Sequence, residues 1–183
     1  MPSARRSPAR SGSLRTLRAG LWLLAATLAA PAYGADEQAE IRTLLASGQS
    51  AAALDLADRA LAAQPRNVPV AFLRGVALMD LQRNEDALAH FERMSQTYPE
   101  LPDPWNNIAL LQVRAGRLDQ ARLSLEFALR NDPGHRTARA NLGLVHLMLA
   151  AQAWETLAAS GPVDPQVTRR LEAVRALLAD GGR

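Results

Sequence analysis

Apolar and small residues in the middle of this chain recur at helical spacing, in short runs that end at glycine or proline. In the clearest run, Trp105, Ile108 and Ala109 follow one another at helical intervals, and Gly116 closes the run. A second run with the same spacing ends before Pro133. Apolar positions three and four residues apart share one face of an α-helix, and Gly and Pro are typical of helix ends. The pattern predicts two short helices that pack together.

The same pattern recurs along the chain at a constant interval of 34 residues. This interval separates Pro65 from Pro99, and Pro99 from Pro133. Equivalent positions keep their residue type or size, which indicates internal repeats, each of them one helix pair. The other equivalent sets are Ala53, Ala87 and Ala121; Gly75, Ala109 and Gly143; Gly48, Gln82 and Gly116; Leu44, Leu78 and Gln112; Ala57, Phe91 and Leu125; Ala60, Met94 and Ala128. We therefore expect a stack of helix pairs.

A fourth unit starts regularly and then departs from the pattern. Gly143 keeps the interval, but no glycine marks the turn near Ala150, and the closing Pro165 comes two residues early. We interpret this segment as a shortened unit, with Ala153 and Leu157 as the packing residues of its second helix.

The last segment predicts one more helix. It opens at Pro165 and places Val167, Leu171, Val174 and Leu178 on one face. Its arginines fall on the solvated side, as a repeat array requires of a terminal capping helix.

The third unit resembles the tetratricopeptide repeat, which carries W-x2-L-G-x2-Y in its first helix and then alanine, an apolar residue, alanine and a closing proline. The matching residues are Trp105, Ile108, Ala109, Gly116, Ala121, Leu125, Ala128 and Pro133. The second unit matches at Gly75, Leu78, Ala87, Phe91 and Pro99, and the weaker first unit keeps Leu44, Gly48, Ala53, Ala60 and Pro65. The resemblance implies an all-α fold, a right-handed superhelical solenoid of helix-turn-helix repeats with a C-terminal capping helix.

The expected organisation follows from these boundaries. It comprises a cleaved secretory signal peptide in residues 1–34, a degenerate first repeat in 35–67, a second in 68–101, a third in 102–135, a shortened fourth in 136–165, and the capping helix and tail in 166–183.

Residues 1–34 have the layout of a secretory signal peptide. Five arginines and no acidic residue come first, the apolar run 21–30 follows, and small residues end the segment. The apolar run is shorter than the roughly 20 residues that span a bilayer. Of two possible cleavage frames we favour the cut after Gly34, which predicts a periplasmic protein. The alternative is an inner-membrane protein anchored by an uncleaved leader.

The net charge of +3 belongs to that leader. Residues 35–183 hold 16 of the 21 arginines and all 18 acidic residues, so their net charge is −2. A basic chain would suggest nucleic acid as a partner, but the mature region is weakly acidic. We therefore expect no nucleic-acid partner. The chain has no cysteine, which excludes disulfides, thiolate catalysis and zinc–thiolate sites.

The sequence contains no motif of an enzyme, metal or cofactor site. HExxH, GxSxG, the P-loop and GxGxxG are all absent. The three histidines, His90, His135 and His146, lack the spacing of paired metal ligands. We expect His146 to be packed, His90 to lie on a solvated helix face and His135 to lie in a turn. The sequence thus predicts no catalytic residue, no cofactor, no metal and no small-molecule substrate.

A second stripe on the first helix of each unit is more apolar than packing within one unit requires. Its members lie four and three residues apart, on a face next to the packing face. The candidate partner-binding residues are Phe72, Val76, Met79, Asn106, Leu110, Val113, Arg114, Leu144 and Leu147. In the family, the corresponding stripe lines a concave groove that holds peptides or partner helices, so the resemblance implies a groove for apolar or amphipathic segments. The alternative is that adjacent repeats, an N-terminal segment or self-association covers the stripe.

Some family members hold a terminal carboxylate in this groove with lysines and asparagines. The matching positions here are Gln38, Arg42, Leu73, Asp103 and Asn107, which would make an incomplete clamp. A match shifted by one unit contains no cation. We expect no capture of a terminal carboxylate.

The leading hypothesis is a non-catalytic scaffold or adaptor of the bacterial cell envelope that binds protein or peptide partners. One alternative is a structural protein that self-associates. The other is an accessory or regulatory subunit of an envelope enzyme, in cell-wall, pilus or cytochrome maturation machinery.

Overall fold

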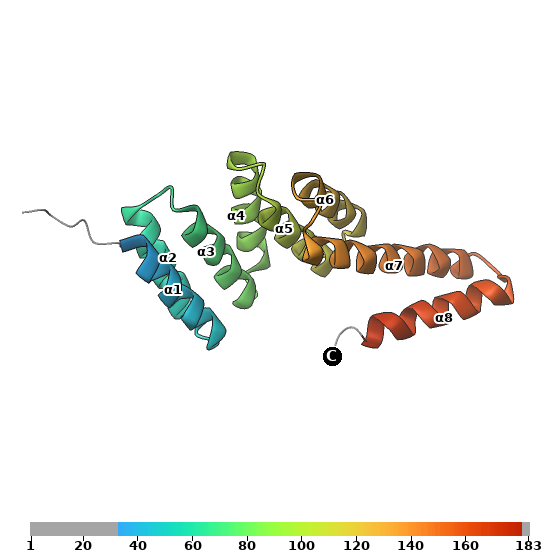
Figure 1. The fold of residues 1–183 in the computed structure, drawn as a ribbon. Coiled ribbons are helices and arrows are strands. Elements are labelled where there is room, and N and C mark those ends of the chain that lie inside the picture. Colours follow the sequence, from blue (N-terminus) through green and yellow to red (C-terminus); the bar gives the residue numbers. More distant parts are fainter. Residues whose placement is uncertain (1–32, 181–183) are drawn as a thin grey trace, which may run out of the picture. The chain divides into compact units, whose positions relative to one another are not determined.

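The computed structural model describes residues 33–180, and within this range the regular structure consists of α-helices alone. The helices are α1 (Tyr33–Ala46), α2 (Ser50–Ala63), α3 (Val68–Asp80), α4 (Asn84–Thr97), α5 (Pro102–Arg114), α6 (Leu118–Asn131), α7 (Arg136–Ala159) and α8 (Pro165–Asp180). Helix α1 includes the last two residues of the predicted signal peptide, and the rest of that segment lies outside the described residues. The predicted all-α solenoid of helix pairs is confirmed (Figure 1).

The first three helix pairs all turn at the same position of the repeat. Gly48, Gln82 and Gly116 occupy this position and have φ angles of 74°, 57° and 72°. Glycine adopts this left-handed conformation readily, whereas a residue with a Cβ is strained by it. After the first turn, Gln49 N donates to Leu44 O at 2.8 Å, and the other two turns repeat this bond. A left-handed residue followed by such a bond ends each first helix.

Small residues at equivalent positions set the distance between the paired helices. Ala53, Ala87 and Ala121 are fully buried. In the second unit the ring of Phe91 lies directly on the backbone of Gly75, where an added Cβ would come within 2.4 Å of the ring. Glycine therefore lets an aromatic ring fit between α3 and α4 without separating them.

One polar contact repeats between successive helix pairs. Ser50 Oγ donates to Asp80 Oδ2 at 3.3 Å, and Arg114 Nη1 donates to Asn84 Oδ1 at 3.2 Å. The two contacts occupy equivalent positions in successive units. Each joins the end of a first helix to the start of the second helix in the preceding unit, so the units stack in the same way.

The fourth unit differs from the prediction. Two short helices are expected in residues 136–165, but α7 runs unbroken from Arg136 to Ala159. The position equivalent to the left-handed turn residues is Ala150, the best helix former, so the helix continues through it. Ala153 and Leu157, which the sequence predicts as packing residues of a second helix, are exposed. The prediction of a separate second helix in this unit is therefore wrong.

The predicted capping helix is confirmed as α8. Leu171 and Val174 are buried, and Leu178 packs beside them. They contact Ala151 and Trp154 in the second half of α7. This half of α7 projects past α6, and α8 folds back along it (Figure 1).

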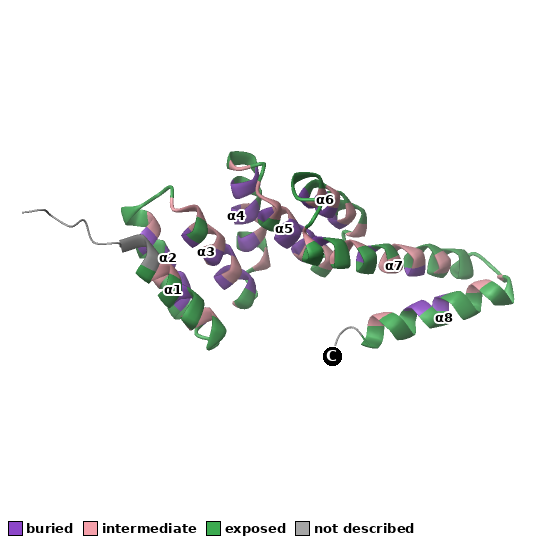
Figure 2. Ribbon diagram, in the orientation of Figure 1, coloured by how far each residue is buried: buried purple, intermediate pink, exposed green. Residues whose placement is uncertain are grey.

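Helix α7 is unusually exposed for its composition. Of the helices in residues 33–180, it alone is long and apolar enough to cross a membrane, judged by length and composition only. Only 11% of its most apolar stretch is buried. Figure 2 shows exposed and half-buried residues along most of its length.

Candidate partner-binding groove

The first helices of successive units form one layer of the solenoid. Helix α1 packs beside α3, and α5 packs beside α7. Two depressions open along this layer, and we name them the N-terminal pocket and the C-terminal pocket.

The N-terminal pocket has a cavity volume of about 360 Å³. Its lining residues come from α1, α3, α4 and the start of α5: Gln38, Arg42, Val68, Pro69, Phe72, Leu73, Met94, Leu101, Asp103 and Pro104. The apolar residues form most of the lining, while Arg42 and Asp103 are exposed and carry opposite charges. An apolar side chain of a partner fits such a pocket when neighbouring polar groups of that partner can pair with Arg42 and Asp103.

The C-terminal pocket is smaller and almost entirely apolar, with a cavity volume of about 170 Å³. Its lining residues come from α5, α6 and α7: Ala109, Leu110, Val113, Leu125, Asn141, Leu144, Val145 and Met148. Leu144 is 42% exposed, whereas Leu125 and Val145 at the base belong to the core. Removal of this surface from water by a partner would be favourable.

The structure places some of the candidate groove residues in this layer as accessible side chains. Phe72 lines the N-terminal pocket, and Leu110, Val113 and Leu144 line the C-terminal pocket. Val76 is half-buried and packs against the core of the first units. The apolar stripe thus forms two separate pockets and not one continuous surface.

Three candidates lie elsewhere because neighbouring helices cover them. Met79 and Asn106 are only 8% and 7% exposed. Asn106 Oδ1 accepts a hydrogen bond from Asn141 Nδ2 at 2.8 Å, so this amide joins α5 to α7. Leu147 packs against the cluster between α7 and α8. Helical spacing within one unit cannot predict this coverage, since it depends on the next helix in the stack.

Arg114 lies outside both pockets. Its guanidinium donates to Asn84 and lines a different depression, between α4 and the turn after α5. Arg114 therefore stabilises the stacking of two units.

The positions that match the carboxylate clamp do come together, in part. Gln38, Arg42, Leu73 and Asp103 all line the N-terminal pocket, whereas Asn107 is buried outside that lining. The acid Asp103 stands where a second cation would be needed to hold a carboxylate. The set offers one cation, so the expectation of no clamp stays a prediction.

His135 holds the rim of the N-terminal pocket in place. Its Nδ1 accepts the amide of Ala138 at 3.1 Å and caps α7, so Nε2 carries the proton and donates to Asp103 Oδ1 at 3.0 Å. The predicted turn position of His135 is confirmed. This contact fixes the start of α5 relative to the start of α7.

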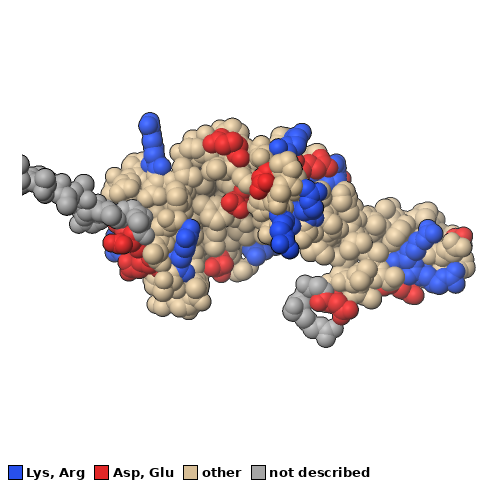
Figure 3. Space-filling view, in the orientation of Figure 1, with Lys and Arg blue, Asp and Glu red and all other residues tan. Residues whose placement is uncertain are grey.

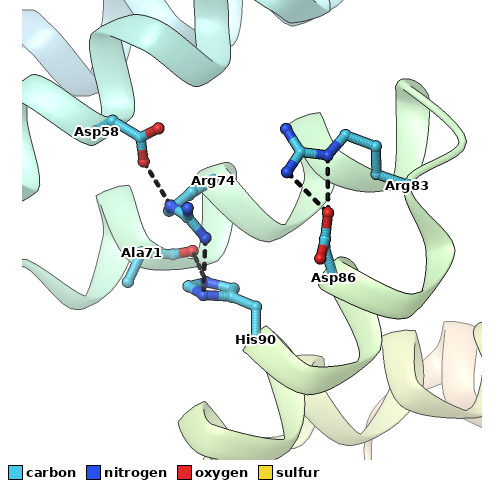
Figure 4. Close-up of polar contacts among 6 residues, drawn as sticks. All are labelled: Asp58, Ala71, Arg74, Arg83, Asp86 and His90. Carbon is cyan, nitrogen blue, oxygen red and sulfur yellow. Dashed lines mark hydrogen bonds and ion pairs between the residues drawn. The ribbon is translucent and has the colours of Figure 1, made fainter.

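His90 is buried, contrary to the expectation of a solvated face. Its Nε2 donates to Ala71 O at 2.6 Å, and its Nδ1 lies 3.4 Å from Arg74 Nη1 (Figure 4). Arg74 Nε in turn donates to Asp58 Oδ1 at 2.6 Å. The network joins α2, α3 and α4. Because its members come from three different helices, no periodicity within one helix reveals it.

Burial lowers the pKa of His90 below its ordinary value of 6.5, and the neighbouring Arg74 adds to this effect, while the hydrogen bond to Ala71 opposes it. As the pH falls, His90 therefore binds a proton at a higher pH in the unfolded chain than in the folded chain. As the pH falls through 6.5, the folded state loses stability relative to the unfolded state, by at most about 1.4 kcal/mol per pH unit.

We expect a His90→Gln variant to lack this loss, because the amide of Gln can donate to Ala71 O but does not titrate. Urea unfolding of both proteins between about pH 7.5 and pH 5 is the measurement. The free energy of unfolding of the parent protein should fall more steeply with acidification than that of the variant. Parallel curves over this range would contradict the assignment.

His146 is exposed, so its predicted packing is wrong. It lies on a face of α7 that no neighbouring helix covers. Among residues 33–180, no group of three or more His, Cys, Asp or Glu side chains is arranged to hold a metal ion.

A sequence model described as tetratricopeptide repeat matches residues 39–102 and 106–149. The matched residues include all of α2 to α6 except the start of α5, and more than half of α7. A search of curated proteins finds no match.

Solved structures share this fold at low sequence identity. The tetratricopeptide domain of Sgt2 from Aspergillus fumigatus is 17% identical, with a TM-score of 0.64 over 73% of this chain and 87% of that one. The protein TTC0263 of Thermus thermophilus is 21% identical, with a TM-score of 0.61 over 79% and 82%. The first such domain of Spaghetti (RPAP3), solved with the HSP90 peptide SRMEEVD, is 16% identical, with a TM-score of 0.58 over 64% and 93%. At these identities the likeness shows the fold alone.

Proposed function

Because this chain belongs to the tetratricopeptide repeat family, we propose that it is a non-catalytic scaffold of the bacterial cell envelope that binds apolar or amphipathic protein segments along α1, α3, α5 and α7. The family and the fold support a protein-interaction scaffold. A related fold bound to a peptide, the domain of Spaghetti with its HSP90 peptide, supports a peptide as the kind of ligand.

The C-terminal pocket is the observation that carries this proposal. It opens on the layer of first helices, its lining is apolar, and Leu144 at its edge is 42% exposed. An apolar pocket beside a half-exposed leucine gains stability when a partner side chain fills it. Met148 in the lining adapts to side chains of different shape.

The N-terminal pocket adds a polar requirement. Arg42 on α1 and Asp103 on α5 border its apolar lining. A segment that spans both pockets would place apolar side chains in each and meet Arg42 with an acidic or carbonyl group. An amphipathic helix or an extended segment with spaced apolar residues has this chemistry.

The envelope location rests on the leader sequence. Basic residues, an apolar run and small residues follow one another in residues 1–34, in the order of a secretory signal peptide.

We expect Leu144→Asp to weaken binding of partners captured from an envelope extract by at least about 10-fold, because the carboxylate enters an apolar pocket at the contact surface. The matched control is Leu123→Asp. Leu123 lies on α6, outside both pockets, and is 46% exposed, close to the 42% of Leu144. This control should keep the affinity of the parent protein.

Two outcomes would count against the groove. Equal binding by Leu144→Asp and the parent protein would exclude the C-terminal pocket as a contact surface. The double variant Phe72→Asp, Leu110→Asp extends the test to both pockets, and its retention of every partner would exclude the whole layer. Far-UV circular dichroism of each variant establishes that it is folded.

A further inference from the structure

The face of α7 that receives a second helix in the preceding units is open. In the second unit, Phe91 of α4 lies on Gly75 of α3. In the third unit, Leu125 of α6 shares a buried cluster with Ala109 of α5. Gly143 holds the equivalent position on α7, and apart from the adjacent backbone of α7 itself no atom of the described chain lies within 4 Å of the place of its missing Cβ. The first half of α7 therefore lacks the helix that the repeat pattern requires.

Besides α5, which bonds to α7 through Asn106 and Asn141, two helices contact α7, and they use other faces of it. Helix α6 packs against Ala138 and Val145, and α8 packs against Ala151 and Trp154. At about 100° of rotation per residue, these two sets point to nearly opposite sides of α7. Leu157 points to a third side, between them, and Gly143 lies between the directions of Leu157 and Trp154.

The second half of α7 carries the packing residues of the missing helix. Ala153 and Leu157 match Ala121 and Leu125 once the two-residue shortening is counted. Ala121 and Leu125 are fully buried in α6, whereas Ala153 is exposed and Leu157 is 49% exposed. In a straight helix the open site and the residues that would fill it cannot meet.

We propose that α7 pairs in antiparallel fashion with α7 of a second copy of this chain, so that Leu157 of each copy lies on Gly143 of the other. The spacing agrees with the register inside the chain. Along the chain, Leu157 follows Gly143 as Phe91 follows Gly75, except for the two-residue shortening of the fourth unit. A two-fold axis near Ala150 fills both open sites at once, as a closed symmetric dimer requires.

A polar pair supports the same register. In the third unit, buried Ser124 Oγ donates to Gln112 Oε1 at 2.8 Å across the helix pair. His146 matches Gln112, and Thr156 matches Ser124. In the antiparallel pair, His146 of one copy would lie beside Thr156 of the other, and an imidazole N–H can donate to the hydroxyl oxygen. The residues at this polar position are thus complementary.

The open face also lacks charge. Gly143, His146, Ala150, Ala153 and Leu157 follow along it at intervals of three and four residues, without Arg, Asp or Glu. In the view of Figure 3, the basic side chains of the α7–α8 hairpin gather toward its outer end. A solvated helix face normally carries charged or polar residues, so an uncharged one indicates a helix partner.

This interface is separate from the groove. Leu144 and Met148 face the C-terminal pocket, on another side of α7. A dimer formed through Gly143 and Leu157 would leave that pocket accessible, so each assembly would present two grooves. Loss of the dimer and loss of partner binding can therefore be told apart.

Sedimentation equilibrium of the protein purified from cells that express the full chain tests the proposal. We expect a dimer. Gly143→Glu and Leu157→Glu should each raise the dissociation constant at least about 100-fold, because the symmetric interface buries the added carboxylate twice. The control Gln152→Glu adds the same charge at an exposed position on another side of α7 and should remain dimeric.

Since the chain has no cysteine, one introduced thiol gives a clean second test. Ala150→Cys places the thiols of the two copies beside the two-fold axis, so copper phenanthroline should convert the variant to a covalent dimer. Gln152→Cys should form no covalent dimer in the same treatment.

Either of two results would overturn the proposal. The first is a parent protein that is monomeric at every concentration, including a monomer that binds lipid vesicles through α7. The second is a Gly143→Glu variant that remains folded by circular dichroism and sediments as the parent dimer does.

Discussion

Phe91→Ala should lower the free energy of unfolding by about 3–5 kcal/mol, the range found when a large aromatic side chain is removed from a core. Phe91 is fully buried on Gly75, and its ring centroid lies 5.7 Å from that of Phe72. A cavity at this point would remove the contact between α3 and α4 and the support behind Phe72 in the N-terminal pocket. Urea unfolding followed by circular dichroism measures the loss.

Phe127→Ala is the matched control. Phe127 is 42% exposed and stacks on Trp105 with a centroid distance of 4.8 Å. Removal of its ring leaves no enclosed cavity, so we expect the free energy of unfolding to fall by roughly 1 kcal/mol. Similar losses for the two variants would contradict the assignment of Phe91 to the centre of the core.

Gly75→Ala and Gly143→Ala should change stability in opposite directions, although the two glycines occupy equivalent positions. The Cβ at position 75 would lie 2.4 Å from the ring of Phe91, which is fully buried and cannot move freely. Overpacking of this kind lowers stability by about 1–3 kcal/mol. At position 143 the Cβ meets no other part of the chain within 4 Å, so in the monomer the helix gains about 0.5–1 kcal/mol from the replacement of glycine.

Urea unfolding of both variants in the Leu157→Glu background, in which the proposed α7 dimer does not form, provides the comparison. Both variants replace glycine by alanine in a helix, so the contribution of helix propensity is the same in each. The difference between them therefore reports the presence or absence of an opposing helix. A loss at position 143 as large as that at position 75 would mean that a helix already covers Gly143 within the chain.

The repeat interval predicts most of the fold because each unit uses the same steric devices. Gly48, Gln82 and Gly116 hold the left-handed turn, and equivalent alanines hold the helix contact. The prediction of a helix pair is wrong in the fourth unit, where the left-handed turn residue is missing. With alanine at position 150, nothing stops α7, and the second helix of the fourth unit does not form.

The candidate groove was less predictable, since burial depends on the neighbouring unit and not on the helix itself. Phe72, Leu110 and Leu144 line pockets, but Asn106 is covered through its bond to Asn141. The pattern within one helix places these four residues on the same kind of stripe. Only the stacking of the next helix separates them.

Buried polar groups were the least predictable feature. His90 packs between α3 and α4 through a backbone carbonyl, Ala71 O, which leaves no mark in the sequence. The equivalent residue in the third unit is Ser124, whose partner is the side chain of Gln112. The two units therefore satisfy the same buried position with different chemistry, so comparison between repeats could not identify it.

The central claim is that a partner lies in the groove along the first helices, and site-specific photo-cross-linking tests it most directly. A photoreactive phenylalanine analogue is placed at Leu144, at the edge of the C-terminal pocket, or at Leu123 on α6, which is similarly exposed. Irradiation in cells that export the protein should yield a covalent adduct with a partner protein from position 144 and none from position 123. Adducts from position 123 alone would contradict the account.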